Sequence, residues 1–299
     1  MVGIKRRPKA LSRQTPGEIA VKSIIVVSLS FLTIITLYPF WYILVASFSD
    51  PYAVVRRGGM MLWVEEPGLY AYREVFRYRL LWTAYRNTII YLSVGLSISM
   101  TLTVFAAYAL SRKDLKGTGV MMKIIVFTMF FTGGMIPTYL VVDGLGMIDT
   151  IWSQVIPHAI NTFNLIVLRT AFKAVPDSIE EAASIDGAQP PQIMFRIIIP
   201  LAMPAIMVIG LYYAVELWNT YFRALLYLKN QDKYPLQMAL RQILIQGDAA
   251  QKDMGFVDTN IQETVKYATI MVSTIPILMV YPFIQKYFVK GVMIGSIKG

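Results

Sequence analysis

The residues best suited to chemistry in this chain gather in one short polar segment, from Val175 to Pro204. The segment lies between two long apolar blocks, and Glu180, Glu181 and Asp186 offer carboxylates there. Small side chains lie beside them, so the backbone of another protein could approach closely. Carboxylates form strong ion pairs with arginine or lysine. The segment is therefore either a docking site for a basic partner or a solvated amphipathic loop.

Local signals predict two short helices within this segment. Asp177, with Glu180 three residues later, is a capping box that starts the first helix. Gly187 is a natural stop, because glycine takes a positive φ without a Cβ penalty. Pro190 and Pro191 block continuation and favour a fresh helix start. The two helices should meet at an angle, with the second running into the next apolar block.

Composition indicates what surrounds this segment. The chain has 299 residues, of which 56% are hydrophobic and 15% charged, whereas soluble domains are about 25% charged. It has no cysteine and one histidine, which excludes disulfides, thiolate catalysis and multi-histidine metal sites. We therefore expect an all-α, polytopic membrane protein with no catalytic residue, metal or cofactor of its own.

Six apolar stretches are long enough to cross a bilayer as helices, which takes about 20 residues. In chain order they are Ser23–Phe48, Asn87–Ser111, Val120–Val142, Ile151–Phe172, Ile197–Trp218 and Val265–Val289. The first is too long for a cleaved signal peptide, whose apolar core has about 7–15 residues. The predicted organisation is a basic tail at 1–22, a six-helix transmembrane domain at 23–290 with the polar loop at 173–197, and a C-terminal tail at 291–299.

The placement of lysine and arginine predicts the orientation in the membrane. If the N-terminus is cytoplasmic, the whole net charge of +10 lies on the cytoplasmic side and the outer side is balanced. The basic residues on that side occupy short segments, such as Lys5, Arg6 and Arg7. This asymmetry is typical of membrane orientation, so we expect no nucleic-acid partner. Both termini and the polar loop should then face the cytoplasm, where ATP is.

Two predicted spans contain features with two interpretations each. In the second span, Ser93, Ser97 and Thr101 form a face of small residues, with Gly95 and Ser99 nearby, which favours either close helix packing or a polar translocation surface. In the third span, Gly133 and Gly134 should break the helix. Such a break is either a plain kink or part of a cavity, because irregular backbone at membrane depth must face protein or water.

Polar side chains in the fourth and fifth spans are candidate substrate contacts. Asn161 and Asn164 lie three residues apart on one helix face. Amides both donate and accept hydrogen bonds, which suits hydroxyl-rich solutes, although they could equally bond neighbouring helices. Glu216 is the one acid that we place inside a span. An intramembrane acid favours a functional role, and a salt bridge or an interfacial position is the alternative.

The spacing in the polar segment resembles the EAA loop of ABC importer permeases. The matching residues are Glu181, Ala182, Ala183, Gly187, Ile197 and Pro200, with Asp186, Ala188, Phe195 and Pro204 in the extended form of sugar permeases. Ile199 stands where the family prefers leucine. In that family the loop docks into a cleft of a cytoplasmic ATPase. The resemblance implies that the ATPase-coupling residues here are Glu180, Glu181, Ala182, Ala183, Asp186, Gly187 and Ala188.

Two other segments resemble carbohydrate permeases of the MalG-like and LplC-like subfamily. Trp218 and Asn219 look like a segment of the MalG type, and the stretch Phe131–Tyr139 resembles LplC-like permeases, which are tied to oligosaccharide uptake. Aromatic faces suit the apolar faces of sugar rings, although aromatic side chains are also enriched at the membrane–water interface without any role in binding. We therefore add Trp218 and Asn219 to the candidate substrate contacts.

The resemblance also implies a set of partners. A MalG-like chain pairs with a second, MalF-like permease chain, with a homodimer as the alternative. Two cytoplasmic ATPase subunits would carry ATP and Mg²⁺, and an extracellular solute-binding protein would deliver a sugar. The complex would lie among lipids in the bacterial inner (cytoplasmic) membrane. The chain itself lacks a Walker A phosphate loop, so we expect a transport subunit rather than an enzyme.

Two other classes of function remain as alternatives. An ion-coupled secondary carrier would keep ionisable relay residues within the membrane, and Glu216 alone qualifies. A membrane enzyme would need a nucleophile–base pattern or paired carboxylates in an apolar cleft, and the sequence shows neither.

Overall fold

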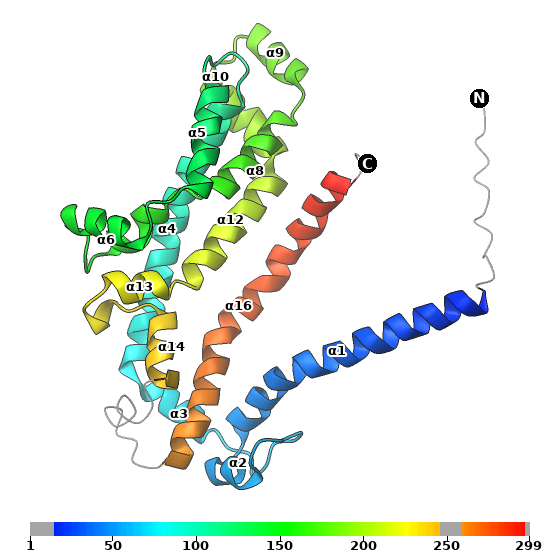
Figure 1. Ribbon diagram of the computed structural model, residues 1–299, viewed down its shortest axis with the longest axis vertical. Helices are drawn as coiled ribbons and strands as arrows, with labels where there is room; N and C mark the ends of the chain where they lie inside the picture. Colours follow the sequence, from blue (N-terminus) through cyan, green and yellow to red (C-terminus); the bar gives the residue numbers. More distant parts are fainter. Residues whose placement is uncertain (1–14, 246–258, 297–299) are drawn as a thin grey trace.

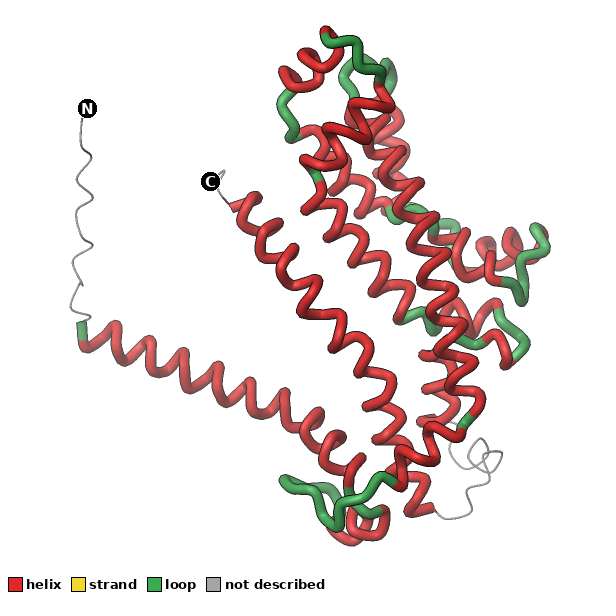
Figure 2. Tube along the Cα trace, turned by 180° about the vertical axis from the view of Figure 1, so that it is seen from behind, coloured by secondary structure: helices red, strands yellow, loops and turns green. Residues whose placement is uncertain are grey.

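The computed structural model describes residues 15–245 and 259–296, and within these ranges every regular element is a helix (Figure 2). The first half contains α1 (Pro16–Phe48), α2 (Pro51–Arg57), α3 (Tyr70–Arg77), α4 (Arg79–Ser111), α5 (Thr118–Phe130), α6 (Met135–Gly144), α7 (Ile151–Val155), η1 (Ile156–His158) and α8 (Thr162–Lys173). The second half contains α9 (Asp177–Ile185), α10 (Pro190–Ile193), the π-helical turn η2 (Met194–Ile198), α11 (Ile199–Leu201), α12 (Met203–Trp218), α13 (Phe222–Tyr227), η3 (Gln231–Lys233), α14 (Leu236–Ile245) and α16 (Thr259–Ser296). The expected all-α class is confirmed. The basic cluster at Lys5–Arg7 lies outside the described residues.

The body of the molecule forms around α4, which packs against α8 and α12, while α16 packs along α12 (Figure 1). α9 and α10 lie at one end of this body, and α2 and α3 lie at the opposite end. The largest buried cluster joins α4, α8 and α12 and includes Leu168, Phe172, Ile198, Ile209 and Tyr213. The polar segment is therefore directly attached to this cluster, because its own residues Ile193, Ile198 and Ala202 help to form it.

The spans follow the predicted ranges in part. In the described residues, α1 and α4 are long and apolar enough to cross a membrane, and the number is four if each of two bent helix pairs counts as one span. α5 and α6 meet at 110°, which confirms the predicted break at Gly133–Gly134, where Gly134 takes a φ of 84°. The helix running from Pro190 to Leu201 meets α12 at 82°. The predicted fourth span is divided among α7, η1 and α8, so the count of six stays a prediction.

Small residues bring helices together along α4. Ser93, Ser97 and Thr101 are exposed on this chain. The buried stripe is displaced from these residues and includes Gly95 and Thr103. α12 comes closest to α4 at Gly95, which has no side chain, and Leu217 of α12 lies against it. Gly95 and Ser99, which lie beside the predicted face, thus form the tight crossing within this chain, and both interpretations of the exposed face at Ser93, Ser97 and Thr101 stay predictions.

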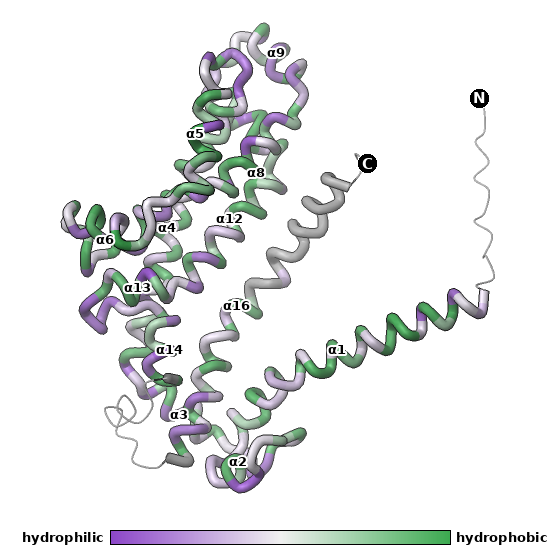
Figure 3. Tube along the Cα trace, viewed as in Figure 1, coloured by the Kyte–Doolittle hydropathy of each residue, from purple (hydrophilic) through white to green (hydrophobic). Residues whose placement is uncertain are grey.

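Helix α1 diverges from the body as an arm, joined to it only at its last turns (Figure 1). It begins at Pro16, capped by Thr15, ahead of the predicted span start at Ser23. Its most apolar window is 0% buried, and Figure 3 shows hydrophobic residues along most of its length. A bare apolar helix of this length needs lipid or another protein around it.

Candidate functional site

The polar segment folds as an elbow of two short helices, α9 and α10. α9 ends where Gly187 takes a φ of 83°, a left-handed conformation that L side chains rarely adopt. The Ala188 N–H donates to the Ala183 carbonyl at 2.9 Å, and the Gly187 N–H donates to the Ser184 carbonyl at 3.1 Å. These two bonds satisfy carbonyls that a helix end otherwise leaves open. The predicted stop at Gly187 is confirmed.

The second helix of the elbow begins at Pro190, as predicted. Its cap is a reciprocal pair that was not predicted, in which the Gln189 N–H donates to the Gln192 side chain at 3.0 Å. The spacing of a polar residue and a glutamine three positions later was the available signal. The chain then passes through a π-helical turn and bends into α12. The elbow is thus joined through this bend to a helix of the transmembrane body.

The predicted capping box at the start of α9 is wrong. Pro176 occupies the cap position, and no side chain caps the helix. The two carboxylates of the expected box are engaged elsewhere, because Glu180 forms an ion pair with Arg112 and Asp177 forms one with Lys113. Charged partners supplied by the connection between α4 and α5 replace the local hydrogen bonds. Sequence spacing alone does not reveal such distant partners.

The coupling candidates fall into two groups by exposure. Glu181, Ala182, Asp186 and Gly187 are exposed, whereas Glu180, Ala183 and Ala188 are half-buried. Ile185 is 86% exposed at the end of α9. The elbow therefore presents two carboxylates, small side chains and one protruding apolar side chain to a partner. Such a surface suits a basic groove with an apolar floor.

Asn161 and Asn164 both take part in packing within this chain. The Asn161 side chain caps α8 by accepting from the Asn164 N–H at 3.2 Å, and Asn164 is buried. The Asn161 N–H donates to the Tyr213 hydroxyl at 2.8 Å, and that hydroxyl contacts Thr103 at 2.8 Å. This hydrogen-bonded chain ties the start of α8 to α4 and α12. Substrate contact by the two asparagines stays a prediction.

Glu216 forms a salt bridge with Arg223, one of the alternatives that the sequence left open. The Arg223 Nη2 lies 3.4 Å from the Glu216 Oε1, and Nη1 donates to the Gln154 carbonyl at 3.2 Å. Arg223 is 12% exposed, while Glu216 remains 40% exposed. Arg223 was not among the predicted site residues, although a cation shortly after the one acid placed inside a span was a usable signal. The pair brings α7, α12 and α13 together.

The two remaining substrate candidates end α12. Trp218 packs against the cluster that joins α3, α4, α14 and α16. Its buried indole N–H has no hydrogen-bond partner among the described residues. Asn219 is exposed, and its amide donates to the Val215 carbonyl at 2.8 Å. In the described residues no group of three or more His, Cys, Asp or Glu is placed to hold a metal ion.

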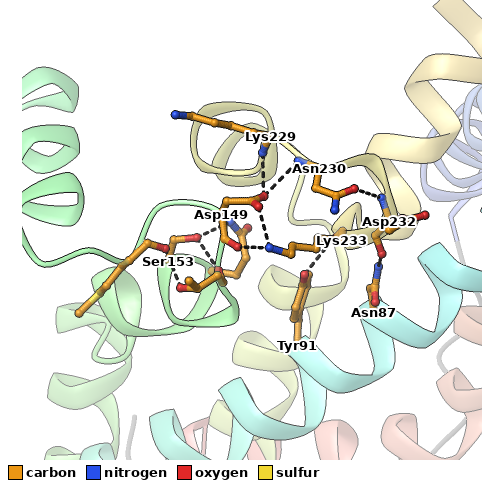
Figure 4. Close-up of polar contacts among 11 residues, drawn as sticks. Asn87, Tyr91, Asp149, Ser153, Lys229, Asn230, Asp232 and Lys233 are labelled. Atoms are coloured by element: carbon orange, nitrogen blue, oxygen red, sulfur yellow. Dashed lines mark hydrogen bonds and ion pairs between the residues drawn. The ribbon is translucent and has the colours of Figure 1, made fainter.

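Away from the elbow, Asp149 in the connection between α6 and α7 joins that connection to the loop after α13 (Figure 4). Its carboxylate accepts from the backbone N–H groups of Lys229 and Asn230 at 3.0 and 3.1 Å, and from the Lys233 ammonium at 2.6 Å. Tyr91 on α4 donates to the Lys233 carbonyl at 2.7 Å. The bond to Lys233, followed by the bond to the Asn230 N–H, lowers the pKa of Asp149 to about 2. Asp149 therefore fixes the entry to α7 against the loop after α13.

The bonds that the Asp149 carboxylate makes to these loops should stabilise the folded chain in a way that depends on pH. Because the folded-state pKa of Asp149 is depressed, its contribution is full above the unfolded value of about 3.9 and is lost as the pH falls toward 2. The difference in thermal midpoint between the parent and Asp149→Asn, measured in detergent, should shrink between about pH 4 and pH 2. A difference that stays constant over that range would show that the carboxylate charge does not hold these loops.

The chain matches a known family of transport proteins over most of its length. The sequence pattern of the family described as "Binding-protein-dependent transport system inner membrane component" matches residues 24–294. The chain belongs to this family. The expected ABC importer permease is confirmed, and the elbow, with its exposed Glu181 and Ala182 and its glycine stop, lies where the EAA loop was predicted.

Individual relatives place the chain among carbohydrate permeases. It is 43% identical over 274 residues to the "Polygalacturonan/rhamnogalacturonan transport system permease protein YtcP" of Bacillus subtilis, covering 91% of this chain and 96% of that one. It is 39% identical over 267 residues to "Protein LplC" of the same organism, covering 89% and 90%. A solved structure of "a bacterial ABC transporter involved in the import of the acidic polysaccharide alginate" matches with a TM-score of 0.87 at 37% identity, covering 92% and 99%.

Proposed function

We propose that this chain is the transmembrane subunit of an ATP-driven importer for acidic, uronate-containing oligosaccharides. The observation that carries the proposal is the similarity over nine-tenths of the chain to permeases whose named substrates are polygalacturonan, rhamnogalacturonan and alginate. All three are polysaccharides with carboxylate-bearing sugar units. The class of transporter follows from the family, and the acidic substrate is the inference drawn from these relatives.

Energy would reach the chain through the elbow. An ATPase bound to Glu181, Ala182 and Gly187 would move α9. The chain connects α9 to α8 on one side and through α10 to α12 on the other. Closure of the ATPase dimer would tilt both helices and switch the access of a central path. Inverting a 1:99 balance between two states takes about 5.5 kcal/mol of differential binding. ATP and Mg²⁺ would be held by the ATPase subunits.

The importer would need partner subunits and one orientation of this chain in the membrane. A second permease chain would cover part of α1, whose apolar surface is bare on this chain, and lipid would cover the rest. Two ATPase subunits would bind at the cytoplasmic elbow, with both chain termini on the same side of a bacterial inner membrane. A binding protein outside would deliver the oligosaccharide; the family description, which names a binding-protein-dependent transport system, supports such a partner. Asn161, Asn164, Glu216, Trp218 and Asn219 remain the proposed substrate contacts.

Uptake into proteoliposomes tests the proposal. The chain is reconstituted with candidate permease and ATPase partners and a binding protein, and uptake of a short galacturonate oligomer is compared with that of a glucose oligomer of equal length. We expect uptake that requires ATP on the ATPase side and favours the galacturonate oligomer by about tenfold. Equal uptake of the neutral oligomer would contradict the acidic substrate. Uptake driven by an ion gradient without ATPase subunits would favour the secondary carrier instead.

A further inference from the structure

The end of α4 holds the elbow through two ion pairs. Arg112 follows α4 directly and pairs with Glu180 in the first turn of α9, and Lys113 pairs with Asp177. Arg112 and Glu180 are only 19% and 17% exposed, whereas Lys113 and Asp177 are 77% and 56% exposed. Exposed pairs contribute little, while partly buried pairs are less screened by water. Arg112–Glu180 is therefore the stronger link between the two elements.

Arg112 is itself fixed in place by α4. Its guanidinium lies over the Tyr108 ring, 4.7 Å from the centroid, and its nitrogens donate to the Ser111 hydroxyl at 3.3 and 3.4 Å. The Tyr108 hydroxyl donates to the Pro190 carbonyl at 3.1 Å, so the same turn of α4 contacts α10 as well. From α8, Arg169 donates to the Leu110 carbonyl at 2.8 Å. The last turn of α4 thus contacts both helices of the elbow and the helix before it.

Packing alone does not fix the angle of α9. No residue of α9 is buried, and of its side chains the small Ala183 reaches the core. A cavity of about 800 Å³ lies between α9 and the body, lined by Tyr108, Arg112 and Phe172 among others. With open space beneath it, α9 could tilt if its polar contacts were lost. The ion pair with Arg112 is therefore the contact best placed to set the angle.

We propose that Arg112 is a positioning residue that clamps the coupling elbow to α4, so that movement of the elbow drives α4 as well as α8 and α12. This inference rests on the proposed coupling role of the elbow and divides its carboxylates by task. Glu180 and Asp177 hold the elbow to its own chain, while Glu181 and Asp186 face the ATPase. Glu180, which the sequence placed among the ATPase-coupling residues, is therefore assigned instead to the contact with Arg112.

A distance measurement on the permease chain alone tests the clamp. The chain has no cysteine, so Ser93→Cys on α4 and Ile185→Cys on α9 give two spin labels at exposed positions. In lipid nanodiscs we expect one narrow distance distribution, lost in Arg112→Gln and in Glu180→Gln and restored by the charge swap Arg112→Glu with Glu180→Arg. Lys173→Gln, which removes a nearby exposed cation, is the matched control and should keep the narrow distribution. An unchanged distribution in Arg112→Gln would overturn the clamp.

A second measurement on the reconstituted complex separates the clamp from the docking role. Arg112→Gln should still copurify with the ATPase subunits, while the amount of sugar transported per ATP falls by about tenfold, a typical size for lost coupling between sites. Unchanged transport per ATP would overturn the proposal. Failure of the docking role is seen separately, as normal ATPase binding by Glu181→Lys, a result that leaves the distance measurement in nanodiscs unaffected.

Discussion

Replacing Gly187 by proline is expected to abolish assembly with the ATPase while leaving the chain in the membrane. The native φ of 83° is out of reach for proline, whose φ is held near −65°. Proline also removes the N–H that donates to the Ser184 carbonyl. The strain and the lost bond together cost about 3 kcal/mol or more, which the short elbow cannot absorb without changing shape.

Copurification of the ATPase subunits with the tagged permease chain measures this effect. We expect a loss of about thirtyfold or more, the size seen when a central interface contact is removed. Gly187→Asn is the matched control, because asparagine tolerates the left-handed region and keeps the N–H. Membrane insertion should be normal in both variants, since no residue of α9 is buried. Normal ATPase recovery with Gly187→Pro would show that the elbow is not the docking element.

Replacing Gly95 by leucine is expected to destabilise the transmembrane body. A Cβ atom at Gly95 would lie 2.9 Å from one methyl carbon of Leu217 and 3.5 Å from Val155. A full leucine side chain has no space there, so α4 and α12 must separate. Overpacking of this kind costs about 1–3 kcal/mol, which corresponds to a drop of roughly 2–12 °C in thermal midpoint.

Thermal unfolding in detergent, followed by helical circular dichroism, measures this difference. Gly210→Ala is a suitable control on α12, because an added Cβ there would meet Met100 at an ordinary 3.7 Å. It should unfold within a degree or two of the parent. If Gly95→Leu unfolds at the parent temperature, the tight crossing of α4 and α12 is not what holds the body together.

Much of the elbow could be predicted because its signals are local. Gly187 and Pro190 set backbone conformations by their own chemistry, so the stop and the restart appear at the predicted residues. The break at Gly133–Gly134 follows from the same kind of reasoning. The helical membrane class could be predicted from composition, because the shares of apolar and charged residues indicate whether a chain lies in lipid or in water. This inference does not depend on any particular contact.

The missed features depend on residues far apart in the sequence. Arg112 meets Glu180 only after α4 and α8 have packed, so spacing suggested a local capping box instead. Tyr213 satisfies the Asn161 N–H across two helices, which no pattern around Asn161 reveals. Hydropathy likewise cannot show that the fourth span is interrupted before Asn161, because a broken helix and a straight one have the same composition.

Labelling of a single cysteine at position 182 tests the central claim most directly. The chain has no cysteine and Ala182 is exposed on the elbow, so Ala182→Cys gives one reactive site for a maleimide that does not cross membranes. We predict labelling in inside-out vesicles, protection when the ATPase subunits are bound, and none in right-side-out vesicles. Labelling from the outside, or full reactivity with the ATPase bound, would contradict the claim that this elbow is the cytoplasmic docking site.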